Sequence, residues 1–140
     1  MQKWMRCIWV MAALGMPFGA YGVPNEEVAG TEEALRWIKQ VDSAEYEAAF
    51  QEMEPSIQAS LKMEVWVSGL SRVRTPMGKL TKRTVKTAFF TTELPGAPSG
   101  AYIVVQFRSQ FANRDKAALE TITLMRAHAS EWLVSGYFIQ

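Results

Sequence analysis

Few residues of this chain have the chemistry and spacing of a catalytic or metal-binding group. Its one histidine, His128, lies in "RAHASEW" without a second histidine, a cysteine or a carboxylate pair nearby, so it lacks the partners of a metal ligand or general base. Ser60 precedes Lys62 by two residues, which is not the Ser-x-x-Lys spacing, and a helix-entry serine explains it better. We therefore expect His128 in a solvated turn, and neither a metal centre nor a cofactor.

The best candidate for proton transfer is Glu120. Strand alternation places its side chain on the helix-facing side of a predicted sheet, beside Ser109 of the neighbouring strand. Isomerase or dehydratase chemistry needs a base and an oxyanion partner in a dry pocket, and only Glu120, Tyr46, Tyr102 and Tyr137 could supply them. The candidates to line a ligand pocket are Glu120, Ser109 and Tyr46. The alternative is that Glu120 lies at a hairpin end, where water or Arg114 and Lys116 solvate it.

Charge is distributed unevenly along the chain. Residues 23–61 contain nine acidic and two basic residues, whereas residues 62–92 contain seven basic residues and one acidic residue. The basic stretch could bind an anionic envelope component or an acidic protein surface, or it could simply be solvated beside the acidic helices. It lacks the interleaved aromatic residues of single-strand binding, so nucleic acid is not an expected partner. The candidates for an anion-binding patch are Arg72, Arg74, Lys79, Lys82 and Arg83.

The first 22 residues, "MQKWMRCIWVMAALGMPFGAYG", have the three parts of a secretory signal. Lys3 and Arg6 form the positive start, an apolar run follows, and small residues end at Gly22. We expect cleavage there and a periplasmic or secreted product without a membrane span or a cysteine; an uncleaved anchor reaching Val23 is the alternative. Loss of Lys3 and Arg6 reduces the fifteen basic residues to thirteen, against fourteen acidic ones, so the cleaved chain would have a formal net charge of about minus one.

The exported chain is predicted to form one α+β domain over residues 31–140. Residues 23–30 show no periodicity and are interpreted as a flexible lead. Apolar residues then recur at spacings of three and four. This pattern predicts one helix with Thr31 as its N-cap, a second capped by Ser43, a short turn, and a third that ends before Gly78.

Past Gly78 the hydrophobic period changes to two, which predicts strands. β-Branched and aromatic residues gather in four runs, at about residues 80–92, 101–111, 118–126 and 132–139. The breaks between these runs have hairpin length, so the strands should form a consecutive antiparallel meander. Helices that cover one face of such a sheet make a two-layer α+β domain.

The hydrophobic pattern also predicts which residues face each other across the hairpins. We expect Phe107 opposite Ile122, Val105 opposite Leu124, and Leu124 opposite Val134. The face predicted to receive the helices holds Val105, Phe107, Ile122, Leu124, Trp132, Val134 and Phe138. The opposite face is half apolar, and any homodimer is expected to form there. The candidates for that interface are Tyr137, Leu133, Arg108 and Met125.

Several short motifs along the chain are distinctive. They are the turn Leu94-Pro95-Gly96, the strand from Phe107 to Phe111, the pair Glu120-Thr121, and the terminal Trp132 with Gly136-Tyr137. In these motifs the chain resembles, over about residues 31–140, a bacterial family catalogued as domain of unknown function 4019. The resemblance implies export and a cystatin-like, nuclear-transport-factor-type α+β cone, and it implies no reaction.

Our leading hypothesis from the sequence is a non-enzymatic module that binds a ligand or a protein in the cell envelope. One alternative is a small pocket enzyme of the isomerase or dehydratase type, because folds of this kind host such chemistry, although a fold alone assigns no function. Another alternative is a structural domain that associates with itself through the outer face of the sheet.

Overall fold

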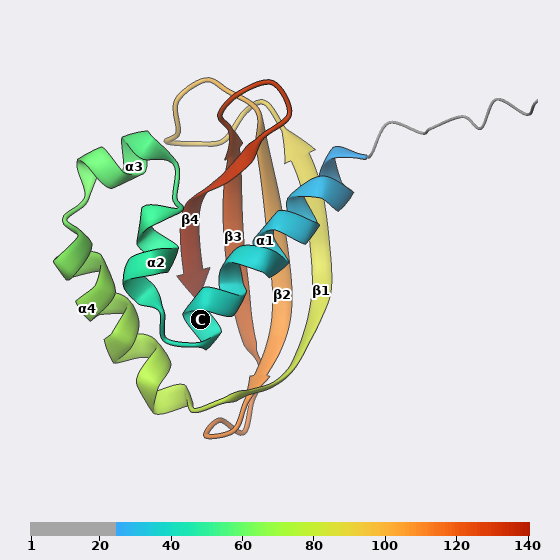
Figure 1. Cartoon of the computed structure of the whole chain (residues 1–140). Coiled ribbons are helices and arrows are strands. Elements are labelled where there is room, and N and C mark those ends of the chain that lie inside the picture. Colours follow the sequence, from blue (N-terminus) through green and yellow to red (C-terminus); the bar gives the residue numbers. More distant parts are fainter. Residues whose placement is uncertain (1–24) are drawn as a thin grey trace, which may run out of the picture.

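The computed structural model describes residues 25–140, so the predicted signal sequence lies outside the described residues. Four helices and a short 3₁₀ turn precede four strands (Figure 1). The helical elements are α1 (Glu26–Asp42), α2 (Tyr46–Gln51), α3 (Pro55–Ser60), α4 (Met63–Arg74) and the 3₁₀ turn η1 (Thr75–Met77). The strands are β1 (Leu80–Thr91), β2 (Tyr102–Phe111), β3 (Ala118–Arg126) and β4 (Trp132–Ile139).

Helix α1 begins earlier than predicted. Asn25 is its N-cap, and the Asn25 side chain accepts a hydrogen bond of 3.0 Å from the backbone N–H of Glu27. Thr31 is therefore not the cap but an interior residue, whose hydroxyl donates to the carbonyl of Glu27 at 2.7 Å. The prediction of a flexible lead was wrong for residues 25–30, because capping by Asn25 and acidic residues in the first turn start the helix before its apolar stripe begins.

Helix α1 crosses one face of the sheet and supplies much of the core (Figure 1). Its buried residues include Trp37, whose indole N–H donates to the carbonyl of Ala49 at 2.9 Å and so joins α1 to α2. Gly30 lies so close to the sheet that a Cβ there would be 2.5 Å from Ile103 Cδ1. Only glycine permits this approach, which brings the first turns of α1 onto β2.

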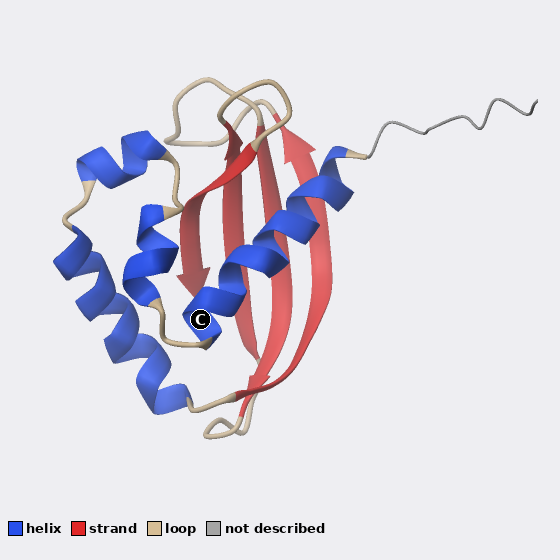
Figure 2. Ribbon diagram, in the orientation of Figure 1, coloured by secondary structure: helices blue, strands red, loops and turns tan. Residues whose placement is uncertain are grey.

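The sheet has the order β1-β2-β3-β4 with antiparallel neighbours, so the predicted meander is confirmed. The helices lie on one side of it (Figure 2), which confirms the two-layer α+β fold. The boundaries of the last three strands agree with the predicted ones to within one residue. Turn-forming residues therefore mark the strand ends correctly in this chain.

The register between β2 and β3 differs from the predicted one by two residues. Val105 lies opposite Ile122, and Phe107 lies opposite Glu120. The hairpin turn is centred between Asn113 and Arg114, one residue earlier than predicted. The N–H of Ala112, at the start of this turn, donates to the carbonyl of Lys79 at 2.8 Å. A shift of two residues leaves each side chain on its predicted face, because the side-chain period of a strand is also two.

A bulge between β3 and β4 has a larger effect. Leu124 lies opposite Val134, as predicted, but Thr123 lies opposite Gly136, so that Ser135 is the extra residue on β4. One extra residue exchanges the two faces for the rest of the strand. The sequence pattern contains no separate signal for this bulge apart from the glycine.

Two predictions for the end of β4 were therefore wrong. Tyr137 faces the helices, where its ring lies 5.8 Å from that of Trp37, and it is no anchor on the outer face. Phe138, predicted to be in the core, is 59% exposed. Leu133 lies opposite Met125 ahead of the bulge, so these two residues keep their predicted face.

Candidate functional site

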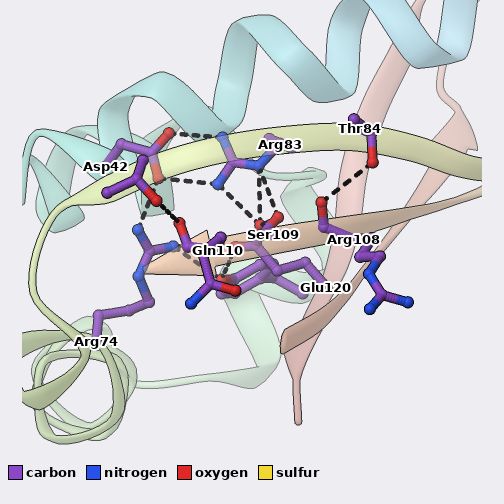
Figure 3. A network of polar contacts seen from close by, with 10 residues as sticks. Asp42, Arg74, Arg83, Thr84, Arg108, Ser109, Gln110 and Glu120 are labelled. Carbon is purple, nitrogen blue, oxygen red and sulfur yellow. Dashed lines mark hydrogen bonds and ion pairs between the residues drawn. The ribbon is translucent and has the colours of Figure 1, made fainter. Parts of the chain in front are cut away.

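Four charged residues meet at the ends of α1 and α4 (Figure 3); Glu120 and the two arginine side chains are buried, whereas the Asp42 side chain is 19% exposed. This charge network consists of Asp42 at the end of α1, Arg74 at the end of α4, Arg83 on β1 and Glu120 on β3. Two acids balance two arginines, so the network is formally neutral. It connects segments that are far apart in the sequence, so it stabilises the tertiary structure and is also the candidate site.

Arg83 lies between the two carboxylates (Figure 3). Its Nη1 and Nη2 donate to the two oxygens of Asp42 at 2.7 and 3.0 Å, and its Nε donates to Glu120 Oε2 at 2.8 Å. The Asp42 contact is the two-bond arrangement that the planar guanidinium favours. Arg83 is thus held on both sides, and its side chain is only 8% exposed.

Arg74 joins the same two carboxylates from the helical layer. Its Nη2 donates to Asp42 Oδ1 at 2.6 Å, and its Nη1 lies 3.1 Å from Glu120 Oε1. Nη1 also donates to the hydroxyl of Tyr137 at 2.9 Å. The guanidinium carbon lies 4.7 Å from the ring centre of Phe111, a cation–π distance. Arg74 is 5% exposed; its two Nη atoms are hydrogen-bonded, whereas its buried Nε has no hydrogen-bond partner among the described residues.

Glu120 is fully buried, and its carboxylate has no free acceptor position. Oε1 accepts from Arg74 and from the hydroxyl of Tyr137, the latter at 2.6 Å. Oε2 accepts from Arg83 and from the hydroxyl of Ser109. A carboxylate offers about four acceptor sites, so these four donors occupy its capacity. Glu120 is bound here as a structural anion, and no position is left for a substrate proton.

The protonation states of the network follow from its contacts. Burial would raise the pKa of the Asp42 carboxyl, but hydrogen bonds from Arg83 and Arg74 outweigh burial and hold this pKa below its ordinary value. Burial, followed by the negative charge of Glu120, raises the pKa of the Tyr137 phenol far above its ordinary value. The phenol therefore stays protonated and remains a donor to Glu120.

The lowered pKa of Asp42 predicts a specific pH dependence of stability. A folded-state pKa below the unfolded value of about 3.9 contributes stability that is present above that pH and is lost as the pH falls through the folded pKa. We expect Asp42→Asn to be less stable than the wild type near neutral pH, and this difference to shrink below about pH 4. Urea unfolding at a series of pH values measures it. A difference that stays constant down to the acid limit would contradict the prediction.

The pocket candidates from the sequence are only partly brought together. Ser109 does lie against Glu120, as the alternation predicted. Tyr46 belongs instead to the hydrophobic core at the start of α2. Neither Glu120 nor Ser109 is exposed at all, and the surface hollows found on the described residues are lined by other side chains. The idea that Arg114 and Lys116 solvate Glu120 was therefore wrong.

The predicted anion-binding patch is not a single surface. Arg74 and Arg83 are buried and bonded to carboxylates, so they cannot receive an external anion. Arg72, Lys79 and Lys82 are exposed. Adjacent residues of a strand point to opposite faces of the sheet, so the neighbours Lys82 and Arg83 could not be expected to share one surface. In the structure Arg83 lies opposite Ser109 on the inward face of β1, and Lys82 lies opposite Gln110 on the outward face.

The remaining candidates have structural positions. His128 is exposed in the turn between β3 and β4, as predicted. Ser60 ends α3 instead of starting a helix, and its hydroxyl donates to the carbonyl of Ile57 at 2.9 Å. Among residues 25–140, no three His, Cys, Asp or Glu side chains lie together where they could hold a metal ion. In the part of the chain that the structure describes, no helix is long and apolar enough to cross a membrane.

Comparison with known proteins identifies a family. Residues 33–137 match the model of a family described as "Protein of unknown function (DUF4019)". No curated protein and no solved structure matches the chain. The family resemblance is thus confirmed, whereas the cystatin-like relationship stays a prediction.

Proposed function

The chain belongs to the family described as "Protein of unknown function (DUF4019)", a description that names no reaction, and we propose that it is a non-enzymatic binding domain of the cell envelope. In this proposal the domain contacts its partner through its surface and not through an interior pocket. The helix-covered side of the sheet serves to hold the fold together.

One observation supports this proposal above the others. The best general base in the chain, Glu120, is buried and receives hydrogen bonds from four side chains. A catalytic base must reach the proton that it abstracts, at about 2.6–3.2 Å or through one water. Glu120 could do so only if its arginine, serine and tyrosine partners moved away.

The pocket-enzyme hypothesis therefore loses its central residue. The Tyr137 hydroxyl is also held within the charge network, because it donates to Glu120 and accepts from Arg74. Ser109 donates to Glu120 as well, which leaves it without a base of its own. In this proposal Glu120, Ser109 and Tyr137 stabilise the packing of the helices on the sheet and do not form an active site.

The envelope location rests on the signal-like first 22 residues and is tested directly. Intact-mass analysis of the chain recovered from the extracytoplasmic fraction should give a protein that starts at Val23. Replacing the small residues Ala20 and Gly22 by phenylalanine should block this cleavage and leave a longer, membrane-retained chain. Recovery of the full-length wild type in the cytoplasm would end the envelope part of the proposal.

A further inference from the structure

The outer face of the sheet carries a groove of about 810 Å³, away from the charge network. It lies across β1, β2 and the start of β3, and the turn between β2 and β3 closes one end. We call it the basic groove and define it by the cations Lys82, Lys86, Arg108 and Lys116, together with Asp115 and Leu119. Arg108 points away from Glu120 and its partners (Figure 3).

The basic groove has an excess of positive charge that nothing in the described part of the chain neutralises. Its four cations and the single carboxylate of Asp115 leave a formal charge of three. None of these cations forms an ion pair with another described residue, and all four are exposed. Cations gathered in a concave surface attract an anionic ligand more strongly than the same cations spread apart.

The spacing of the cations indicates an extended ligand. Lys82 and Lys86 are four residues apart on β1, which is at most about 13 Å at roughly 3.3 Å per residue, because a bulge between Val85 and Thr87 shortens the strand there. Arg108 lies between them, because it is opposite Thr84. A single phosphate cannot span this row. Carboxylates on alternate residues of an extended peptide repeat about every 6.6 Å, which does match it.

The lining of the groove argues against other polyanions. The described residues that line it include no aromatic side chain, whereas single-stranded nucleic acid is normally bound by stacking on aromatic rings. A membrane surface is broad and cannot follow a concave floor across three strands. Leu119 and Ala117 in the lining suit small aliphatic side chains between the charges of a peptide.

We propose that the basic groove binds an extended acidic peptide segment of a partner protein, with carboxylates at alternate positions facing Lys82, Arg108 and Lys86. This inference rests on the proposed function, since it names the surface and the partner class of the binding domain. A second copy of this chain is a less favoured occupant, because its acidic residues in 26–54 lie mostly on helices and not on an extended segment.

The test uses the exported chain and a short acetylated peptide in which glutamate and alanine alternate. Isothermal titration at low salt should detect binding, and the affinity should fall at least tenfold at about 0.15 M salt, where the screening length is near 8 Å. The matched peptide with lysine in place of glutamate should not bind. Inorganic phosphate, anionic vesicles and a single-stranded oligonucleotide are the competing probes, and each should bind more weakly than the acidic peptide.

Paired charge reversals separate the groove from general electrostatic attraction. Lys82→Glu with Arg108→Glu should weaken peptide binding at least tenfold. Lys62→Glu with Arg72→Glu makes the same change in net charge at exposed positions on the helical side and should change binding less than about twofold. Asp115→Asn should act in the opposite direction and strengthen binding about twofold, because it removes the one acid of the groove.

Three results would overturn the inference. The first is that both double charge reversals weaken peptide binding equally. The second is that vesicles or the oligonucleotide bind more tightly than the peptide. The third is a dimer in sedimentation that dissociates when the charges of Lys82 and Arg108 are reversed. The last result would assign the groove to a second copy. None of these results restores an accessible Glu120, so failure of this inference is distinct from failure of the non-enzymatic proposal.

Discussion

Replacing Glu120 by glutamine is expected to lower the free energy of unfolding by about 3–5 kcal/mol, because it leaves two buried arginines with a single carboxylate. Glutamine keeps the size of the side chain, so the loss reports charge and hydrogen bonding and not a cavity. For a domain of this size the loss corresponds to a fall in Tm on the order of 10–20 °C. Urea unfolding at neutral pH, monitored by tryptophan fluorescence, measures it.

The matched control for this substitution is Glu32→Gln. Glu32 is exposed on α1 and forms no ion pair with another described residue. Its replacement should change the free energy of unfolding by less than about 0.5 kcal/mol. If Glu120→Gln were as mild as this control, the carboxylate would not be a structural anion, and a functional role for it would have to be reopened.

The second large effect is expected at Arg83, the residue that contacts both carboxylates. Arg83→Gln should also cost about 3–5 kcal/mol, because Asp42 and Glu120 would then face each other with only Arg74 between them. The double variant Arg83→Gln with Glu120→Gln should cost less than the sum of the two single changes, by about 0.5–3 kcal/mol. This double-mutant cycle measures the coupling directly.

Strict additivity of these two changes would contradict the network. Residues without shared partners usually give additive effects to within about 0.5 kcal/mol. If the single variants prove too unstable to purify, Tyr137→Phe and Ser109→Ala are milder substitutions. Each removes one neutral hydrogen bond to Glu120, worth about 0.5–1.5 kcal/mol, and their combination with Glu120→Gln gives the same kind of cycle.

The fold could be predicted from the sequence because its signals are local. The change of hydrophobic period after Gly78 separates the helices from the sheet, and the turn segments mark the strands. The start of α1 was missed because Asn25 and two glutamates begin the helix before any apolar stripe is visible. Capping chemistry was the better guide there than periodicity.

The candidate site could be predicted only in part, because it depends on register and on contacts distant in sequence. The Glu120–Ser109 pair followed from strand alternation. The inward position of Tyr137 could not follow, since it depends on a bulge of one residue at Ser135. The pairing of Arg74 and Asp42, 32 residues apart, depends on how two helix ends meet on the sheet.

Whether Glu120 is inaccessible in the folded protein can be measured by chemical labelling of carboxylates. The folded protein is treated with a water-soluble carbodiimide and an amine at mildly acidic pH, and each glutamate is followed by peptide mass spectrometry. We expect Glu120 to stay unlabelled until the protein unfolds globally, while the exposed Glu32 and Glu47 react quickly. Labelling of Glu120 in the folded protein at a rate similar to that of Glu32 would contradict it.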